Sequence, residues 1–447
     1  MPAYLNTLIE YLDTEPIKVL SGVRRCGKST LLEMLYEHLK ASVPAENLVL
    51  LKCDSSNVPL NASAEWLDDH VQQLMKKANS DHRIYFLLDE VQEIDSWERV
   101  IRRIHTDKNT DVYITGSNAF LLSSDLATYL SGRYIEIHVY PLSFKEYVSF
   151  SRELGNEANG EDALFAEYMR YGGMPGLFGL RKWSEDGIAL ELQSIHDTVI
   201  LNDVAKRFEI RDIDLLEKLV KYLFSTSGNL FSTRSIVGAL NSSGRKVYAE
   251  TIDSYIDALR RAFLIYQCEQ EGVQGKSLLR PMRKFYAPDT GLRNLEIGFA
   301  SKDIGFQLES IVAIELARRG FKFAVGSLKE GEIDFVASKR DERLYIQVSQ
   351  SVMEASTLER EICPLEFVGD SFPKFVLTLD RIGLGVRSDG IKVMNLIDWL
   401  LQDAGSSYER SVTKSRSRLS RITLRGLQLR SHHEESEREG ELGMLQA

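Results

Sequence analysis

Residues 21–30 read "SGVRRCGKST", a short loop between the apolar run "IKVL" at 17–20 and the helix-like pattern "LLEMLYEHL" at 31–39. Gly22 to Ser29 fit the spacing GxxxxGK[ST], after a predicted strand and at the start of a predicted helix. Glycines let the backbone curl so that several N–H groups point at phosphate oxygens, and the helix N-terminus adds its positive end. The stretch therefore predicts a phosphate-binding loop rather than an ordinary strand-to-helix turn.

The side chains of this loop have separate expected roles. Lys28 is predicted to reach the β- and γ-phosphates of a nucleotide, and Ser29 to bind Mg²⁺. Arg24 and Arg25 either contact the nucleotide or are solvated, and Cys26 is interpreted as a small spacer. The predicted nucleotide-binding residues are Gly22, Val23, Arg24, Arg25, Cys26, Gly27, Lys28, Ser29 and Thr30.

A second apolar strand ends in two carboxylates. The segment "RIYFLLDEVQEI" at 83–94 places Asp89 and Glu90 at the carboxyl end of a buried strand. Downstream of a phosphate loop, Asp89 is predicted to hold Mg²⁺ through water and Glu90 to orient and deprotonate the attacking water. The alternative is a strand capped by acidic surface residues. The strand "NLVLLKCD" at 47–54 comes between these two motifs, and we expect it to be inserted between their strands in the sheet.

Two further segments supply polar residues. "VYITGSN" at 112–118 ends another buried strand with Thr115, Ser117 and Asn118, which could sense the γ-phosphate or the water; simple loop capping is the alternative. "LSGRYIEI" at 130–137 places Arg133 before the last strand, where it could neutralise transition-state charge in its own subunit or a neighbour's. An ordinary surface arginine is an equally weighted alternative. The predicted catalytic residues are Lys28, Glu90, Asn118 and Arg133.

The pattern of elements predicts five regions. Strands alternate with helix-length crossovers up to residue 145, which indicates a parallel sheet covered on both faces. The fold class expected is α/β: a P-loop NTPase sheet, then helical and winged-helix regions, then a smaller α/β domain. The predicted boundaries are 1–145 for the nucleotide domain, 146–210 for a helical subdomain, 211–290 for a winged helix with its wing at 275–287, 291–401 for the second α/β domain, and 402–447 for a disordered tail rich in Ser and charge.

Composition limits the partners and the compartment. The 447 residues carry a formal net charge of −10, so no global positive field recruits nucleic acid, although a local basic face stays open. Four cysteines without a CxxC pair suggest neither a zinc site nor a disulfide framework. With no signal-like start and no apolar run of membrane length, we expect a cytoplasmic protein with reduced thiols and no membrane partner.

Several motifs occur together in one order: "GVRRCGKSTLL", "FLLDEVQEI", "ITGSNAFLLS", "GRYIEI", "YPLSFKEY", "YGGMPG", "FYAPDTGLRN" and "EIDFVA". Together they resemble a prokaryotic family of AAA-type ATPases that carry a C-terminal domain of unknown function with a restriction-endonuclease-like core. The resemblance covers roughly residues 1 to 401. It implies ATP binding, a winged-helix segment and a nuclease-like fold.

The same resemblance implies a set of C-terminal residues. Nucleases of this fold gather a helix Glu, a strand Asp and a following Glu/Gln-x-Lys around metal ions, and Glu309, Asp334 and Gln347 match the first three. Ser349 stands at the lysine position, which favours a fold whose chemistry is lost, although a lysine from another element could restore the charge. Glu332 lies two residues before Asp334 on the same strand face.

The winged-helix segment leaves two interpretations of equal weight, a DNA reader and a protein-packing module. Its basic residues are Lys246, Arg260 and Arg261 on the helices and Arg280, Arg283 and Lys284 on the wing, against the acidic neighbours Glu250, Asp253 and Asp257.

The function expected is an ATP-binding, ATP-hydrolysing AAA-type ATPase, with DNA association and homo-oligomer formation left open. One alternative is a nucleotide-regulated, metal-dependent nuclease, which Ser349 argues against. The other is an ATP-driven signalling or scaffold switch with little turnover, which Glu90 argues against.

Overall fold

In this computed structural model the described residues are 2–117, 133–155, 160–242, 244–272, 282–299, 303–329 and 331–402. Asn118, Arg280, most of the predicted wing and all but the first residue of the predicted tail at 402–447 lie outside them. Among the described residues no helix is both long and apolar enough to cross a membrane. All four cysteines are free.

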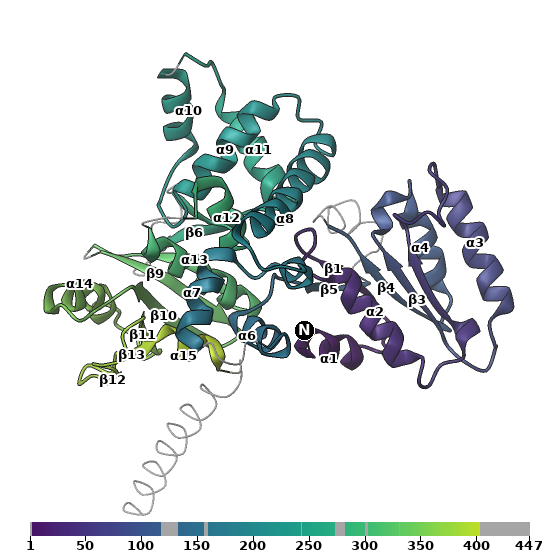
Figure 1. The fold of residues 1–447 in the computed structure, drawn as a ribbon, viewed down its shortest axis with the longest axis horizontal. Coiled ribbons are helices and arrows are strands. Elements are labelled where there is room, and N and C mark those ends of the chain that lie inside the picture. The colour runs from purple at the N-terminus through teal and green to yellow at the C-terminus, as the bar shows by residue number, and fades with distance from the viewer. Residues whose placement is uncertain are drawn as a thin grey trace, which may run out of the picture. The chain divides into compact units, whose positions relative to one another are not determined.

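A parallel five-stranded sheet forms the N-terminal part of the described chain (Figure 1). Residues along its strands alternate between two apolar cores: Leu20 and Leu87 face one core, whereas Val19 and Phe86 face the other. This alternation follows from the period of two in a strand, and burial on both faces explains the continuous apolar runs. The strands are β1 (Ile17–Ser21), β2 (Leu48–Lys52), β3 (Ile84–Asp89), β4 (Thr110–Thr115) and β5 (Tyr134–His138).

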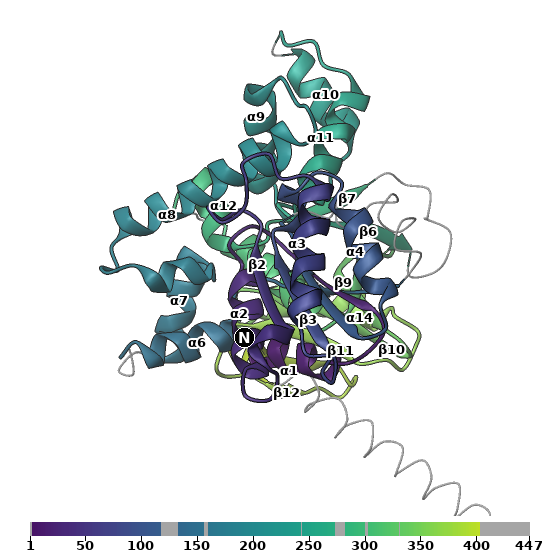
Figure 2. The ribbon, with the colours of Figure 1, turned by 90° about the vertical axis from the view of Figure 1, so that its right-hand side faces the viewer.

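Helices cover both faces of this sheet (Figures 1 and 2). Helices α1 (Pro2–Glu10) and α2 (Lys28–Leu39) contribute to the first core, and α3 (Ala64–Lys77) and α4 (Trp97–Thr106) to the second. Two short 3-10 turns, η1 (Ala45–Asn47) and η2 (Val91–Glu93), complete the connections. The α/β class with a parallel sheet is therefore confirmed.

The order of the strands corrects one prediction. The sheet runs β2-β3-β4-β1-β5, so the strand between β1 and β3 is β4, and the strand at 47–54 lies at the edge beyond β3. The polar end of β4 is thereby placed between the phosphate loop after β1 and the two carboxylates after β3. Because parallel strands end at the same edge, all three candidate segments meet there.

The middle of the chain is helical. Ser143 and Glu146 form a reciprocal capping box that starts the first of these helices. The helices are α6 (Phe144–Glu153), α7 (Glu161–Tyr171), η4 (Pro175–Gly179), α8 (Glu185–Thr198), a π-helix η5 (Val199–Lys206), α9 (Ile213–Ser225), α10 (Thr233–Ser242), α11 (Ala249–Arg261) and α12 (Thr290–Ile297). Three helices thus occupy the segments predicted for a winged helix; the described residues do not establish that fold, since 273–281 lie outside them.

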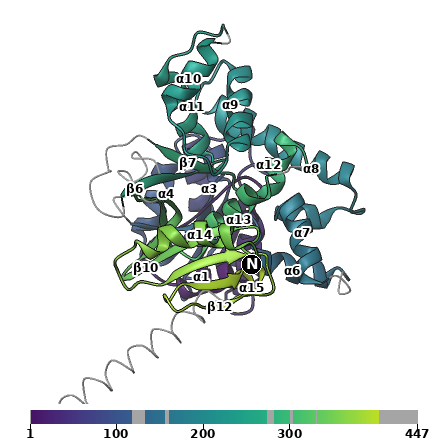
Figure 3. The same ribbon diagram turned by 90° about the vertical axis from the view of Figure 1, so that its left-hand side faces the viewer.

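A second sheet contains eight of the described strands and mixes parallel and antiparallel pairs (Figure 3). Its order is β12-β13-β11-β10-β9-β8-β6-β7. The strands are β6 (Tyr266–Gly272), β7 (Arg283–Tyr286), β8 (Lys322–Ser327), β9 (Glu332–Lys339), β10 (Glu342–Ser349), β11 (Lys374–Thr378), β12 (Gly385–Val386) and β13 (Lys392–Asn395), with α13 (Ile304–Arg318), α14 (Ala355–Glu366) and α15 (Leu396–Leu401). Strands from both sides of the predicted boundary at 290/291 therefore share one sheet.

Candidate functional site

The loop between β1 and α2 is shaped by residues with positive φ. Gly22 has φ 139°, and a Cβ there would lie 2.1 Å from the carbonyl oxygen of Val139. Gly27, the residue before α2, has φ 105°, and Arg25 has φ 63°. Glycine adopts such angles without the clash that a Cβ causes, so the two glycines of the motif are needed for this backbone path.

The Lys28 ammonium lies inside the curve of the loop. The side chain is buried, and Nζ donates to the carbonyl oxygens of Gly22 and Val23 at 2.9 and 3.1 Å. Val23 and Cys26 are fully buried, and burial raises the pKa of the Cys26 thiol, which fits its interpretation as an uncharged spacer. A phosphate in the loop would offer Lys28 stronger, charge-assisted acceptors than these carbonyls.

Three elements meet at the carboxylate of Asp89, the last residue of β3. Its Oδ1 accepts hydrogen bonds from Ser29 Oγ of α2 at 3.0 Å and from Thr115 Oγ1 of β4 at 2.6 Å. Burial raises the pKa of Asp89, and these two hydrogen bonds counteract that rise. A serine hydroxyl beside a carboxylate is a pair of hard oxygen ligands of the kind Mg²⁺ prefers. The residues present therefore fit the metal that the motif implies.

Glu90 follows Asp89 in a left-handed backbone conformation, with φ 51°. Its backbone N–H donates to Thr115 Oγ1 at 2.9 Å, and Gln92 Nε2 donates to its Oε2. A non-glycine residue in this region costs of order 1–3 kcal/mol and is found preferentially at functional sites. The carboxylate is thus held in a defined position beside Asp89, by a backbone conformation that no residue pattern in this segment predicts.

Sequence reasoning missed two acidic residues that the fold brings to the loop from the helical region. Arg24 Nη1 lies 3.3 Å from Oδ1 of Asp203, which also accepts from Ser117 Oγ at 3.1 Å. Arg25 Nη1 lies 2.9 Å from Oε1 of Glu191. These partners are more than 160 positions away along the chain, so no local pattern could pair them.

Arg133 lies at the amino-terminal ends of the strands, whereas the loop lies at their carboxyl-terminal ends. It precedes β5, whose Tyr134 is in register with Ile17 at the start of β1. Burial lowers the pKa of His105 at the end of α4, and the charge of Arg133 lowers it further. Five strand residues at about 3.3 Å each separate these amino-terminal ends from Gly22, roughly 16 Å. An arginine side chain does not span that distance, so Arg133 is not brought to the loop of its own subunit.

Comparisons with known proteins agree with this geometry. A family model described as an AAA domain matches residues 14–148, and a model for a domain of unknown function (DUF8612) matches residues 162–303. An "Uncharacterized protein" of Haemophilus influenzae is 38% identical over 400 residues, which are 89% of this chain and 98% of that protein. The chain belongs to this family of AAA-domain proteins.

Further similarities are weaker. "Uncharacterized protein MJ1544" of Methanocaldococcus jannaschii is 28% identical to this AAA-domain protein over 358 residues, 77% of each chain. The Walker-type ATPase PABY2304 of Pyrococcus abyssi covers 66% of this chain and 95% of its own, with 16% identity and a TM-score of 0.46. Similarity at this level does not extend to function.

The AAA-domain protein carries a second polar cluster in its C-terminal sheet, which includes the residues matched to nucleases. Glu309 of α13, Asp334 of β9 and Gln347 of β10 do come together: Gln347 Oε1 accepts from the Asp334 backbone N–H at 2.6 Å. Lys284 of β7, a residue of the predicted wing, is instead buried among the carboxylates. Its Nζ lies 2.5 Å from Glu332, 3.4 Å from Glu309 and 3.9 Å from Asp334.

The ionisable groups of this cluster affect one another's protonation. Burial raises the pKa of Glu309 to about 8, with Asp334 adding to the rise and Lys284 opposing it. Burial also raises the pKa of Asp334 to about 6. The Lys284 ammonium thus occupies a position among three carboxylates where a cation is needed. Within the described ranges, no group of three or more His, Cys, Asp or Glu side chains is arranged to hold a metal ion.

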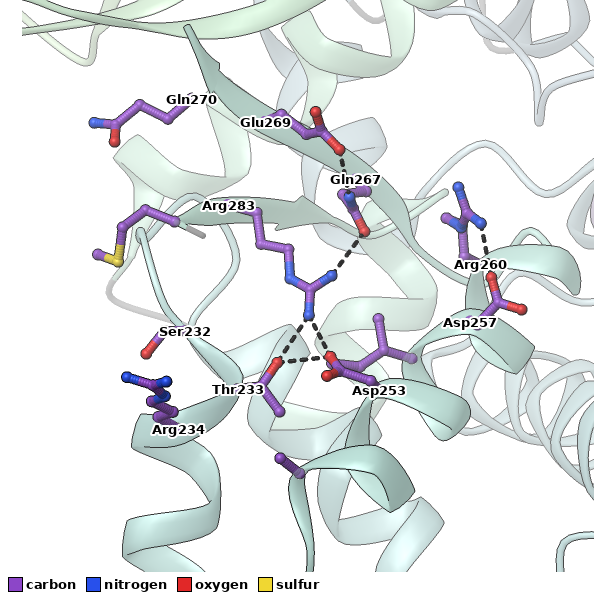
Figure 4. A pocket seen from close by; sticks show the side chains of 13 residues that line it. Ser232, Thr233, Arg234, Asp253, Asp257, Arg260, Gln267, Glu269, Gln270 and Arg283 are labelled. Carbon is purple, nitrogen blue, oxygen red and sulfur yellow. Dashed lines mark hydrogen bonds and ion pairs between the residues drawn. The ribbon is translucent and has the colours of Figure 1, made fainter. Parts of the chain in front are cut away.

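Three of the basic residues of the predicted DNA-binding segment are paired with acids. Arg283 Nη2 contacts Asp253 at 2.6 Å, and Arg260 and Arg261 both contact Asp257 at 2.7 Å. These residues, Arg261 excepted, line a pocket of about 1130 Å³ between α10, α11 and the strands β6 and β7 (Figure 4). Because the acidic residues Asp253, Asp257 and Glu269 line it beside Arg234, Arg260 and Arg283, this surface lacks the excess of basic groups that phosphate backbones require.

Proposed function

We propose that this AAA-domain protein binds Mg-ATP in the loop of residues 22–29 and hydrolyses it. One observation carries the proposal: Ser29 and Thr115, from two different elements, both donate hydrogen bonds to Asp89 of a third, at the carboxyl edge of a parallel sheet. The AAA-domain match at 14–148 includes every one of these residues. Ligands of open α/β sheets bind at this edge.

Binding uses the loop backbone and two side chains. The N–H groups at the start of α2 donate hydrogen bonds to phosphate oxygens, and Lys28 exchanges its two carbonyl partners for the β- and γ-phosphates. Ser29 and Asp89 would hold Mg²⁺, which supplies positive charge that neutralises the phosphates. Thr115 keeps Asp89 oriented, because its hydroxyl donates to Oδ1 while accepting from the Glu90 backbone.

Hydrolysis requires a group that orients and deprotonates water, and Glu90 is the residue proposed for it. It lies next to the proposed metal ligand, and Gln92 fixes one of its carboxylate oxygens. General base catalysis of this kind contributes about 10²- to 10⁴-fold to a rate. Glu90→Gln keeps the size and hydrogen bonding of the side chain but removes the base.

Two variants with matched controls test binding and chemistry separately. ATP at about 100 times its dissociation constant should stabilise the wild type by about 2.7 kcal/mol in a thermal shift assay. Lys28→Ala should lose this shift, whereas Lys40→Ala, an exposed lysine that follows the same helix, should keep it. An undiminished shift in Lys28→Ala would refute the assignment of the loop.

For the chemistry, Glu90→Gln should bind ATP but lose at least about 100-fold in turnover. Glu93→Gln, which changes an exposed carboxylate in the next turn, is the control and should hydrolyse ATP normally. Unchanged turnover in Glu90→Gln would mean that another base acts. ATP binding by the wild type without turnover would favour the alternative of a nucleotide switch.

Arg133 enters this proposal only as a residue supplied by another subunit, because in its own subunit it lies at the end of the sheet opposite to the loop. An arginine contributed in trans makes turnover per subunit rise with protein concentration, and Arg133→Ala should then lower kcat more than binding. Concentration-independent turnover would remove both Arg133 and a homo-oligomer from the mechanism.

Neither DNA association nor nuclease activity belongs to the function we propose. The pairing of Arg260, Arg261 and Arg283 with acidic partners gives DNA binding little support. Lys284 supplies, from another element, the charge that Ser349 lacks, but among the described residues no group of three or more His, Cys, Asp or Glu side chains is arranged to hold a metal ion, which gives a metal-dependent nuclease equally little support. ATP turnover measured with and without duplex DNA tests the first point, since a DNA-dependent ATPase would be stimulated.

A further inference from the structure

The two arginines at the tip of the phosphate loop contact the helices that follow the AAA domain. Arg24 pairs with Asp203 of the π-helix η5, and Arg25 pairs with Glu191 of α8. Helix α8 continues directly into η5, so both contacts involve one continuous helical segment, residues 185–206. The candidate nucleotide site and this segment are therefore joined through side chains of the loop itself.

The two contacts differ in how strongly solvent weakens them. The side chains of Arg25 and Glu191 are 44% and 25% exposed, so water and salt screen their attraction. The Asp203 side chain is only 3% exposed. A buried carboxylate that loses its cation pays a larger electrostatic penalty than an exposed one. Breaking the Arg24–Asp203 contact therefore costs the helical segment more free energy than breaking the Arg25–Glu191 contact.

Asp203 also interacts with the loop that follows β4 and with the charge of Glu90. Its Oδ1 accepts from Ser117, two residues beyond Thr115. Burial raises the pKa of Asp203, Arg24 and Ser117 lower it, and the charge of Glu90 raises it. The carboxylate thus lies within electrostatic range of the proposed base. Its own π-helix is a rare geometry that occurs mostly at functional sites.

A bound triphosphate competes with Asp203 for Arg24. A guanidinium binds carboxylate and phosphate with similar fork geometry, and Arg24 belongs to the same loop that curls around the phosphates. The negative charge of the triphosphate also repels a carboxylate beside Glu90. The nucleotide and Asp203 therefore compete for the side chain of Arg24.

We propose that ATP binding breaks the Arg24–Asp203 contact and releases residues 199–206 from the nucleotide loop, so that this helical segment responds to the nucleotide state. This inference rests on the proposed ATP binding. ADP, which lacks the γ-phosphate, competes less well for Arg24 and leaves the contact largely intact. The segment then distinguishes ATP from ADP, which is what a regulatory output of an ATPase requires.

Thermodynamic linkage makes the proposal quantitative. If ATP weakens the Arg24–Asp203 contact by some factor, that contact weakens ATP binding by the same factor. Coupling between sites typically amounts to about 5- to 150-fold. Asp203→Asn, which keeps the size of the side chain but removes its charge, should therefore tighten ATP binding about fivefold or more, and should tighten ADP binding less.

Hydrogen–deuterium exchange of the full chain reads the segment directly. In the wild type, amides of residues 199–206 should exchange faster with a slowly hydrolysed ATP analogue and Mg²⁺ than with Mg-ADP. In Asp203→Asn these amides should exchange fast under both conditions. Arg24→Gln should behave in the same way, because it removes the other partner and leaves Lys28 in place.

Controls separate this inference from the function beneath it. Asp197→Asn changes an exposed aspartate of the same segment and should leave both the ATP affinity and the exchange response unchanged. If the analogue binds but residues 199–206 exchange at the same rate with ATP analogue and ADP, this inference is overturned while ATP binding stands. If Lys28→Ala and the wild type behave alike because neither binds nucleotide, both fall together.

Discussion

Removing the charge of Lys284 should destabilise the C-terminal sheet. Lys284→Met keeps the length of the side chain but leaves Glu309, Glu332 and Asp334 without the ammonium that lies 2.5 to 3.9 Å from each. Deleting one partner of a buried ion pair typically costs about 3–5 kcal/mol. Lys284 is 3% exposed, so water does not replace it.

The cost should depend on pH, because the carboxylates can take up protons instead. At pH 7.5 Glu309, whose pKa is raised to about 8, is largely protonated in the wild type, whereas Asp334, raised to about 6, is ionised. Protonating Asp334 at pH 5 removes the charge that Lys284 would neutralise. One pKa unit is worth about 1.36 kcal/mol, so the cost should be about 2 kcal/mol smaller at pH 5 than at pH 7.5.

The measurement is the free energy of opening from native-state hydrogen exchange in β9 and β10, taken for the full chain at both pH values. Lys322→Met, at an exposed position of β8, is the matched control and should change this free energy by less than about 0.5 kcal/mol. The double variant with Asp334→Asn, which removes the charge that Lys284 neutralises at pH 7.5, should recover part of the loss. A cost below about 1 kcal/mol, or equal costs at the two pH values, would refute the view that Lys284 neutralises this cluster.

Three further outcomes are expected. Burial raises the pKa of Asp289 to about 6, so between about pH 4 and 6 the folded state holds a proton that the unfolded state has released. This proton's contribution to the free energy of unfolding is lost as pH rises from about 4 to 6. In urea unfolding, Asp289→Asn should lack this part of the pH dependence. Gly22→Ala should abolish the ATP thermal shift, because its Cβ would meet the Val139 carbonyl, whereas Gly160→Ala has open space and should keep the shift. Purified protein incubated with DNA or RNA in Mg²⁺ or Mn²⁺ should cleave neither above the Asp334→Ala background.

The nucleotide loop and the carboxylates after β3 could be predicted because each is a local pattern in a strand-to-loop context. Their side-chain partners agree with the roles expected for Lys28, Ser29 and Asp89, although those roles stay predictions. The lateral order of the strands could not be read in the same way. Sequence order does not state which strand is the neighbour of which, and β4 rather than β2 separates the two motif strands.

Long-range partners account for the rest. Lys284 is a single lysine in a four-residue strand, and only the pairing of β6 with both β7 and β8 turns it toward carboxylates that follow later in the chain. Lys284 lies two residues before Tyr286, so both side chains point to the same face of β7, and this spacing is the one local feature that points to burial of the lysine. Asp203 carried no hint at all, because its meaning depends on Arg24, which lies 179 positions earlier.

The place of β6 in the second sheet has a consequence for how the chain folds while it is synthesised on the ribosome. The five strands of the first sheet are complete by His138, so that sheet can close early. Strand β6 instead runs parallel to β8, and β8 ends about forty residues after β7. At roughly 5–20 residues per second, β6 waits about 2–8 s with an unpaired edge. A nascent chain released after residue 290 would keep that edge permanently, and would therefore be prone to pair with other chains.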